Sequence, residues 1–507
     1  MESNEERQAK TVRDTLLNLP DTELHERRKV RRDYAFYKGK SANLKLAKET
    51  KDKALYGQNW ETDDNCDYKP TQDIRNKVKP LLKKQARWMF GKEPTLMFKP
   101  NDFKDKDKCE ELRRFIDDIF EENNFWSNTR KAFLESTIKK RVLLRVEANP
   151  NMPLVIKYET IENFYYKEKN GVLLKVIFFE EDELNVYREA DSDKIYYLHT
   201  YYYKVNESTG ERQAWYMKQT YKNTNLQEEL TIDQDTGFST IPCWLIKNGG
   251  ELNDSFGESD ITELEDAQNQ YNRRISDFAD ALRFQLFGAE TVIDGNAEDV
   301  NNFTIAPNAL HAVRTRDELL NSGKQATVQR QEYNIGNSAA MESYLDRAEN
   351  DMNFALDMPK LSDLNNIPSA KAMIYLYNDL IARCGEKWND WERPLLELID
   401  FILEVGKVCY PKTFNAEWSS LQYTKILKQN FPLPSDEDDK KTMAISEVKA
   451  NVRSRKSYIK EFSDEEDSEK AFEEILEEMS QITNAETDQY TKSLDSELNG
   501  GGNNGEE

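Results

Sequence analysis

The spacing of apolar residues divides the chain into helical and strand-forming stretches. Before about residue 140, apolar positions recur every three or four residues, and in residues 73–94 this period predicts an amphipathic helix that ends at Gly91 ahead of Pro94. From about residue 142 to Ile246 the period is two, aromatic and β-branched residues are frequent, and an Asn-Gly pair at 170–171 marks a hairpin turn. This order predicts helices followed by an antiparallel sheet, an α+β fold.

A long helix is expected directly after the sheet, from Ser259 to about Phe287. Ser259 suits the N-cap position, and acidic residues in the first turn favour the positive end of the helix dipole. At about 1.5 Å per residue such a helix is on the order of 45 Å long. Gln268 interrupts its near-heptad apolar stripe. The residues of the stripe are Leu264, Tyr271, Ile275, Phe278 and Leu282. One apolar face on so long a helix implies a partner surface.

The rest of the chain alternates between short elements and helices. Residues 289–330 predict short strands and turns, and a helix is expected from about Asn337 to Leu356. The longest helical period starts at Ser369 and lasts about 40 residues, and only Pro394 disturbs it. Because proline removes a backbone hydrogen bond and clashes with the preceding turn, we expect a kink near residues 390–394.

Charge and hydropathy restrict the class of protein. The 507 residues carry a net charge of -23, and residues 435–507 hold 21 Asp and Glu against 9 Lys and Arg. Such an acidic chain should not hold nucleic acid by neutralising phosphates, so any DNA contact is expected to be loose or local. No apolar run approaches the roughly 18 residues of a membrane helix, and the first 32 residues do not resemble a secretory signal.

No stretch of the sequence carries a recognisable catalytic or metal-binding motif. Gly39-Lys40-Ser41 could end a phosphate-binding loop, but position 34, where that loop needs a glycine, is Tyr34. The three histidines are far apart in sequence, and the five cysteines form no CxxC pair, which suits reduced thiols. No GxSxG or paired Cys/His signature is present. We therefore expect a protein without catalytic residues, metal or cofactor.

The stretch 87–98, RWMFGKEPTLMF, allows two interpretations. Its basic and aromatic residues could form a platform for nucleic acid. The same residues also fit the end of a helix that turns into a core strand, which is the interpretation we favour.

The order of these elements resembles the portal proteins of tailed bacteriophages, specifically the SPP1-type (Gp6-like) family from phages of Gram-positive bacteria. The matching motifs are Tyr37-Lys38-Gly39, the run from Phe90 to Pro94, Ile241-Pro242, Asn248, Gly257, Ser259-Asp260, the polar positions Tyr271, Asn272, Ser276 and Asp277, the run from Pro368 to Ala372, and an acidic close. The resemblance covers nearly the whole chain. Two positions depart from it: Lys139-Lys140-Arg141 stand where relatives usually place a glycine before a strand, and the run after Pro368 lacks a glycine that many relatives have.

The resemblance implies a ring, usually of twelve subunits, at one vertex of a capsid. DNA would enter through its axial channel during terminase-driven packaging and leave through it during ejection. The implied partners are terminase, a head-completion adaptor, scaffolding and major capsid proteins, and the double-stranded DNA itself, with no membrane. The implied location is the virion, after assembly in the host cytoplasm.

Carried onto this sequence, the resemblance implies a portal fold with a division into segments. These are a wing (1–258), two stem helices (259–288 and 331–356), a small α/β clip (289–330), a tunnel loop (357–369), a long kinked wing helix (370–410), a helical crown (411–485) and a disordered acidic tail (486–507). In the tunnel loop, the residues expected to face DNA are Lys360, Ser362, Asn365 and Asn366. In the clip, those expected to dock terminase or adaptor are Arg314, Arg316 and Lys324.

Two other classes of function remain open at this point. The chain could be a helical scaffold or coiled-coil structural protein of the virion, whose long helices pack with a different partner. It could also be an enzyme whose site has no recognised motif.

Overall fold

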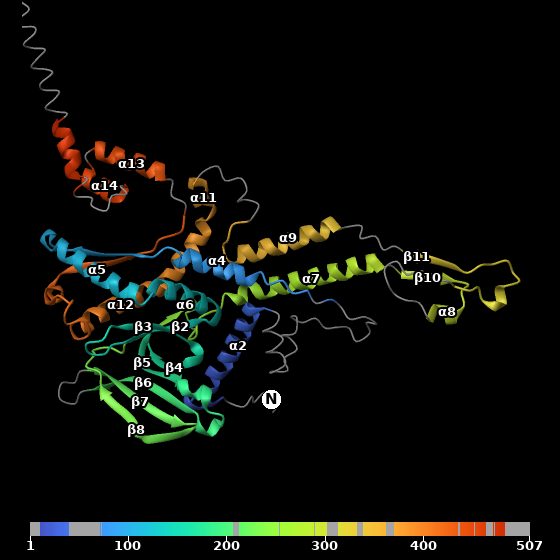
Figure 1. Cartoon of the computed structure of the whole chain (residues 1–507), viewed down its shortest axis with the longest axis horizontal. Helices are drawn as coiled ribbons and strands as arrows, with labels where there is room; N and C mark the ends of the chain where they lie inside the picture. Colours follow the sequence, from blue (N-terminus) through green and yellow to red (C-terminus); the bar gives the residue numbers. More distant parts are fainter. Residues whose placement is uncertain are drawn as a thin grey trace, which may run out of the picture. The chain divides into compact units, whose positions relative to one another are not determined.

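The computed structural model describes residues 11–39, 71, 73–205, 212–252, 254–287, 289–301, 313–331, 338–360, 370–433, 437–450, 452–462, 470 and 472–481 (Figure 1). The chain forms two compact units. One, which we call the body, consists of Met1–Ile367 and Ile374–Pro432, and the other, the C-terminal unit, consists of Pro368–Met373 and Leu433–Glu507. The described elements mix helices with antiparallel sheet, which confirms the α+β class.

One layer of the body is made of helices whose apolar faces meet around aromatic rings. Its helices are α2 (Asp21–Lys38), α4 (Val78–Phe90), α5 (Lys106–Glu122), α6 (Phe125–Lys139) and α12 (Asn378–Cys409), and the short α1 (Val12–Leu16) precedes them. At the centre, Phe90 of α4 contacts Phe133 of α6 at 5.7 Å and Trp391 of α12 at 5.2 Å between ring centroids. Trp391 is only 1% exposed, so the apolar stripe of α12 is a core face.

The strand-forming region builds two antiparallel sheets rather than the single sheet expected. The first has the order β3-β2-β9, from Val155–Thr160, Arg141–Glu147 and Cys243–Lys247. The second has the order β4-β5-β6-β7-β8, from Phe164–Lys169, Val172–Glu181, Ile195–Val205, Arg212–Lys222 and Asn225–Asp235. The predicted turn between β4 and β5 is confirmed, because Asn170 and Gly171 have φ angles of 52° and 75°, as a type I′ turn needs.

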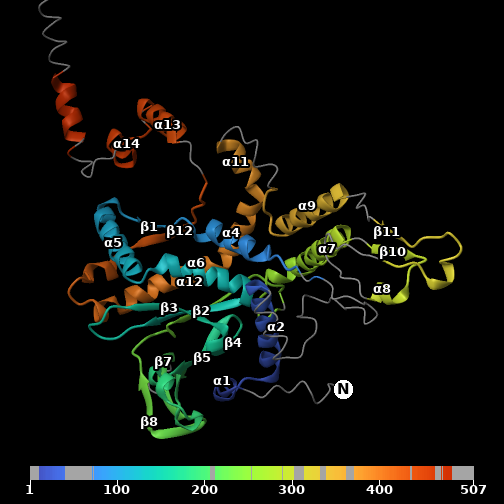
Figure 2. The same ribbon diagram turned by 45° about the vertical axis from the view of Figure 1, so that its right-hand side comes forward.

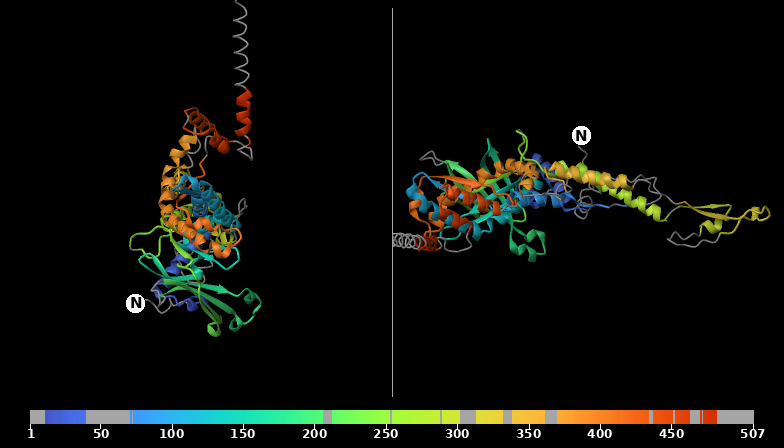
Figure 3. Two further views of the ribbon diagram at one scale, coloured as in Figure 1. Left: turned by 90° about the vertical axis from the view of Figure 1, so that its left-hand side faces the viewer. Right: turned by 90° about the horizontal axis from the view of Figure 1, so that it is seen from above.

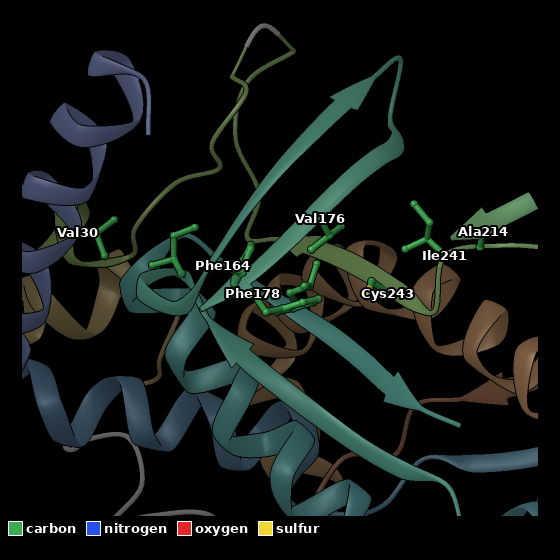
Figure 4. Close-up of a cluster of buried hydrophobic side chains, with 9 residues drawn as sticks. Val30, Phe164, Val176, Phe178, Ala214, Ile241 and Cys243 are labelled. Carbon is green, nitrogen blue, oxygen red and sulfur yellow. The ribbon is translucent and has the colours of Figure 1, made fainter. Parts of the chain in front are cut away.

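The two faces of the five-stranded sheet are buried by different parts of the body. Val176 and Phe178 of β5 point into a cluster with Val30 of α2 and Cys243 of β9 (Figure 4). The alternate residue Phe179 packs instead with residues that follow α1, including Leu17 and Leu19. Since side chains alternate along a strand, neighbouring residues of β5 pack into two separate cores. Because both faces of β5 are buried, its sequence is an almost continuous run of apolar residues.

Two sequence-based boundaries need correction. The long helical period after Ser369 gives two helices, α11 (Ala370–Leu376) and α12, with Tyr377 in a non-helical conformation between them. Pro394 lies within α12, and the kink there stays a prediction. The crown was expected from residue 411, but β12 (Tyr423–Lys428) pairs with β1 (Thr95–Pro100), so residues 411–432 belong to the body. A backbone ladder between segments more than 300 residues apart leaves no local sequence signal.

The same β1 settles the interpretation of residues 87–98. Trp88, Met89 and Phe90 are buried at the end of α4, and β1 begins at Thr95. The favoured interpretation, a helix end that turns into a core strand, is therefore confirmed, and no aromatic platform forms there.

Two long helices of the body lie side by side and carry a small insert between them (Figures 1, 2 and 3). They are α7 (Ile261–Phe287), about 40 Å long at the usual rise, and α9 (Ser338–Ala355). The insert contains the hairpin β10 (Ala289–Ile293) and β11 (Thr327–Gln331) with the short α8 (Ala297–Asn301).

The C-terminal unit contains α13 (Glu437–Lys449), α14 (Arg455–Phe462) and a further helical stretch at 472–481. The expected disordered tail, 486–507, lies outside the described residues.

Several features expected from composition can be checked on the described part of the chain. Within it, no helix is long and apolar enough to cross a membrane, and no group of three or more His, Cys, Asp and Glu side chains could hold a metal ion. Cys109, Cys243, Cys384 and Cys409 are free and buried, and Cys66 lies outside the described residues.

A buried ion pair fastens α2 to the first sheet. Arg141 of β2 is completely buried, and its Nη2 donates to both carboxylate oxygens of Glu23 at 2.8 and 2.9 Å. Glu23 also accepts from Arg27 Nε at 3.0 Å, and Arg27 in turn donates to the carbonyl of Phe164. One carboxylate therefore accepts hydrogen bonds from two buried guanidinium groups.

We expect Glu23→Gln to destabilise the protein by about 3–5 kcal/mol, because it leaves two buried guanidinium groups without a counter-charge. Urea denaturation followed by tryptophan fluorescence would measure the change. The matched control is Glu397→Gln, whose partner Arg393 is 84% exposed, and its effect should stay below about 1 kcal/mol. Equal losses in both variants would contradict the role given to Glu23.

Candidate functional site at the base of the long helices

A ladder of hydrogen bonds joins α7 to the segment 71–77 that precedes α4, in which residue 72 lies outside the described residues. Four polar side chains of α7, spaced four residues apart, accept the backbone N–H groups of every second residue of this segment. The pairs are Lys77 to Gln268 Oε1 at 2.9 Å, Arg75 to Asn272 Oδ1 at 3.1 Å, Asp73 to Ser276 Oγ at 2.8 Å and Thr71 to Asp280 Oδ2 at 2.9 Å. The side chain of Gln268 also donates to the Arg75 carbonyl at 2.8 Å.

The ladder keeps its register because one step of four residues along α7 is nearly as long as one step of two residues along the segment. Four residues of α-helix rise about 6 Å, and two residues of extended chain span about 6.6 Å. The side chains of α7 thus act as a neighbouring strand would, and all four of them are buried. This corrects the expectation of helix from residue 73: residues 73–76 are not helical, the N–H groups of Asp73, Arg75 and Lys77 bond to α7, and α4 begins only at Val78.

The ladder also explains why α7 has buried polar residues at positions 268, 272, 276 and 280, which the spacing of its apolar residues does not account for. Gln268 stands out in the sequence only as an interruption of the stripe, and nothing nearby indicates its partner. Lys77 continues the connection to α9, where its Nζ lies 3.0 Å from both carboxylate oxygens of Glu349. The segment 71–77 is therefore fixed to both long helices.

The expected packing residues of α7 divide into two groups. Leu264, Tyr271 and Ile275 are buried within the body, and Phe278 is half-buried. Leu282, nearer the far end of α7, is 42% exposed. In a single chain, the apolar stripe is therefore covered only over its first half.

A buried junction holds the first turn of α7 against α6 and α12. Asp260 is 3% exposed, and its Oδ1 accepts from Lys387 Nζ and from Asn248 Nδ2, both at 2.9 Å. Its backbone N–H donates to the carbonyl of Thr137 at 2.8 Å. Burial raises the pKa of Asp260, but Lys387 and Arg383 outweigh burial and hold the pKa below its usual value. The carboxylate is therefore a fixed negative charge.

The residues that precede α7 are determined by the close approach of two backbones. The N–H of Asn248 donates to the carbonyl of Lys140 at 2.8 Å. Gly257 has a φ of 81°, and a Cβ there would lie 2.7 Å from the same carbonyl, so only glycine fits. Ser259 then caps the helix, with its Oγ 3.3 Å from the N–H of Ile261.

Lys140 itself accounts for one departure from the resemblance. Its φ is 73°, a conformation that favours glycine, and it lies in the run Lys139-Lys140-Arg141 where the resemblance leads us to expect a glycine. The Nζ of Lys140 forms an ion pair with Glu26 of α2. Burial raises the pKa of the neighbouring Asp33 to about 6, although Lys140 and Ser259 act in the opposite direction. We interpret the ion pair as compensation for the strained backbone.

Arg383 of α12 extends the junction to the end of α9. Its Nη2 lies 3.0 Å from Glu263 and 3.6 Å from Asp260, and its Nη1 lies 3.5 Å from Asp357. Asp357 is the first residue of the expected tunnel loop. Sequence reasoning missed Arg383 and Lys387, whose only signal is the spacing of two cations by one turn on a helix with a buried face.

Comparison with known protein families shows which family the chain belongs to. Residues 17–485 match the sequence model of the family described as phage portal protein, SPP1 Gp6-like. The chain belongs to this family of portal proteins. No curated protein matches the chain significantly. The family consists of structural components of the bacteriophage capsid rather than of enzymes.

In this portal-family chain, the expected clip residues lie in different surroundings. Arg314 donates from Nε and Nη2 to the two carboxylate oxygens of Asp299, at 3.2 and 3.1 Å. Arg316 donates to the carbonyl of Gly295 at 3.1 Å, so both arginines are used inside the insert. Lys324 is exposed, and the structure shows no side-chain partner for it among the described residues.

Only one of the four expected tunnel-loop residues lies in the described part of the portal-family chain. Lys360 is exposed at the edge of a hollow of about 390 Å³ that is otherwise lined by α9 residues such as Arg347, Asp351 and Phe354. Ser362, Asn365 and Asn366 lie outside the described residues.

We expect Asn272→Ala to release the segment 71–77 from α7. The variant leaves the N–H of Arg75 without its acceptor, which should cost about 1–3 kcal/mol. Hydrogen–deuterium exchange should show faster exchange of the amides of residues 73–77, with little change in the sheets. The control is Asp277→Ala, an exposed position on the same helix. If Asn272→Ala lowers global stability without accelerating exchange in this segment, Asn272 is only a core residue.

Proposed function

We propose that the chain assembles into a ring at the unique vertex of a bacteriophage capsid and forms the channel through which DNA enters and leaves. The observation that carries this proposal is the family match over residues 17–485, which spans every described part of the body from Leu17 onwards. The number of subunits, usually twelve in the family, belongs to the same proposal. The match favours this function over the alternative of an unrelated virion scaffold.

The paired long helices support the assignment of α7 and α9 as stem helices. Both carry the small insert of β10, α8 and β11 at their far ends, which suits a clip that docks terminase during packaging and the head-completion adaptor afterwards. At their other ends the ladder and the junction fix them to the body. The exposed second half of the apolar stripe, including Leu282, is then available to a neighbouring subunit.

The charge of the chain suits a conduit. Twelve copies with a net charge of -23 each would carry about -276 charges in total. Affinity for DNA comes mainly from Lys and Arg that displace counterions, so an acidic wall limits adhesion while DNA moves. In this proposal the protein has no catalytic residue, metal or cofactor, because terminase supplies the work of packaging.

The remaining parts of the proposal follow from the same assignment. The loop 357–369 would face DNA, and the C-terminal unit from Leu433 would form the crown. Scaffolding and major capsid proteins would surround the wing, and assembly would take place in the host cytoplasm before the protein becomes part of the virion.

Light scattering after size exclusion tests the ring directly. We expect a particle near twelve times 59.3 kDa, and end-on electron microscopy should show a central opening. A compact species of 59.3 kDa at every concentration would overturn the proposed function.

We expect Lys360→Glu to reduce DNA packaging several-fold without preventing ring formation, because it places a negative charge where the proposed tunnel loop begins. Packaging in vitro with terminase, measured as nuclease-protected DNA, gives the readout. The control is Lys407→Glu, a charge reversal at an exposed position of α12. Unchanged packaging by intact Lys360→Glu rings would remove Lys360 from the loop's DNA contacts.

A further inference from the structure

The helix α4 has a charge composition opposite to that of the chain. It contains Lys79, Lys83, Lys84 and Arg87 and no acidic residue, whereas the whole chain carries -23. Every other helix of eight or more residues in the described part of the chain contains at least one Asp or Glu. Four cations on one short helix repel one another, so their arrangement needs an explanation beyond helix stability.

Three of these cations form a stripe along the solvent side of α4. Lys79, Lys83 and Arg87 follow one another at intervals of four residues, so the stripe is about 12 Å long. The opposite face is fixed in the core, where Leu82 and Met89 are fully buried. Within the described part of the chain, no carboxylate forms an ion pair with any of the three.

Aromatic rings hold two of the cations of α4 without neutralising them. Lys79 Nζ lies 5.9 Å from the ring centroid of Tyr37, and Lys84 Nζ lies 5.5 Å from that of Tyr377. A cation over a ring keeps its charge and loses some of its freedom of movement. Lys79 of the stripe and the neighbouring Lys84 therefore keep their charge and are restrained in position.

The two ends of α4 contact the elements on both sides of the proposed tunnel loop. Lys77, just before α4, is bonded to Glu349 of α9, the helix that leads into the loop. Trp88, near the end of α4, stacks on Tyr377 at 4.3 Å, directly before α12 and after the loop. The helix α4, which carries the stripe, therefore lies beside residues on both sides of the proposed loop.

The chemistry of the stripe favours a nucleic acid over a protein partner. Protein interfaces usually have an apolar centre, and the exposed side of α4 offers only its cations and Pro80. The spacing of about 6 Å between successive cations is close to the rise of two phosphates on one DNA strand, about 6.8 Å. A polyanion with regular charges fits this surface better than an acidic peptide.

We propose that Lys79, Lys83 and Arg87 bind the phosphate backbone of the DNA as it passes the base of the tunnel loop. This inference rests on the proposed function and adds a specific contact to it. Three cations in each subunit provide a weak, non-sequence-specific contact inside an otherwise acidic channel, so they guide DNA without holding it.

The test is the triple variant Lys79→Glu, Lys83→Glu, Arg87→Glu in the full chain. Binding of purified rings to a labelled DNA duplex is measured by fluorescence anisotropy over a range of salt concentrations. We expect the affinity to fall about tenfold or more at low salt, and the slope of log K against log salt to become shallower by about one for each lost phosphate contact. The matched control, Lys104→Glu, Arg114→Glu, Arg130→Glu, reverses three exposed cations elsewhere and should keep most of the affinity.

Electron microscopy of the same samples separates the possible failures. If the unmodified protein forms no ring, the proposed function fails and this inference falls with it. If all proteins form rings and both triple variants bind DNA equally, only the inference about the stripe is overturned. If the stripe variant alone fails to form rings, the stripe is a contact between subunits, which also overturns it. Weaker DNA binding by intact rings of the stripe variant alone supports the proposal.

Discussion

The body depends on one constraint: the backbone N–H groups of Thr71, Asp73, Arg75 and Lys77 need acceptors, and side chains of α7 supply them. In a sheet, such N–H groups would pair with a neighbouring strand. Here one polar side chain on each turn of α7 takes the place of the partner strand, and the register holds because four helical residues and two extended residues have nearly the same length. Small polar residues can therefore repeat on a helix that is otherwise apolar on this side.

Buried ion pairs fix the relative positions of helices and strands, which non-directional hydrophobic contacts alone would specify less precisely. Asp260 joins the start of α7 to Lys387 of α12, and Arg383 adds the end of α9. Glu23 does the same between α2 and Arg141. A buried charge has few acceptable partners, so each pair specifies one arrangement, although its net contribution to stability is small.

The distribution of charge connects the fold with the proposed conduit. An acidic chain limits adhesion to DNA as a whole, and the basic stripe of α4 is a local exception at the base of the proposed loop. The acidic chain and the basic stripe are compatible because binding strength depends on the number of phosphates that are neutralised. Three cations in each subunit neutralise few phosphates, so the contact stays weak.

The sequence by itself determined the class of elements, the hairpin turn at Asn170-Gly171, the long helix that Ser259 caps and, by resemblance, the family. These are local properties: turn conformations, caps and apolar periods act over a few residues. The tertiary structure decided that residues 73–77 lie outside α4, that Tyr377 separates two helices, that β12 pairs with β1, and that Arg383 contacts Asp260 and Asp357. Each of these depends on groups far apart in the chain, so the free energy that selects them appears only when the distant partner is in place.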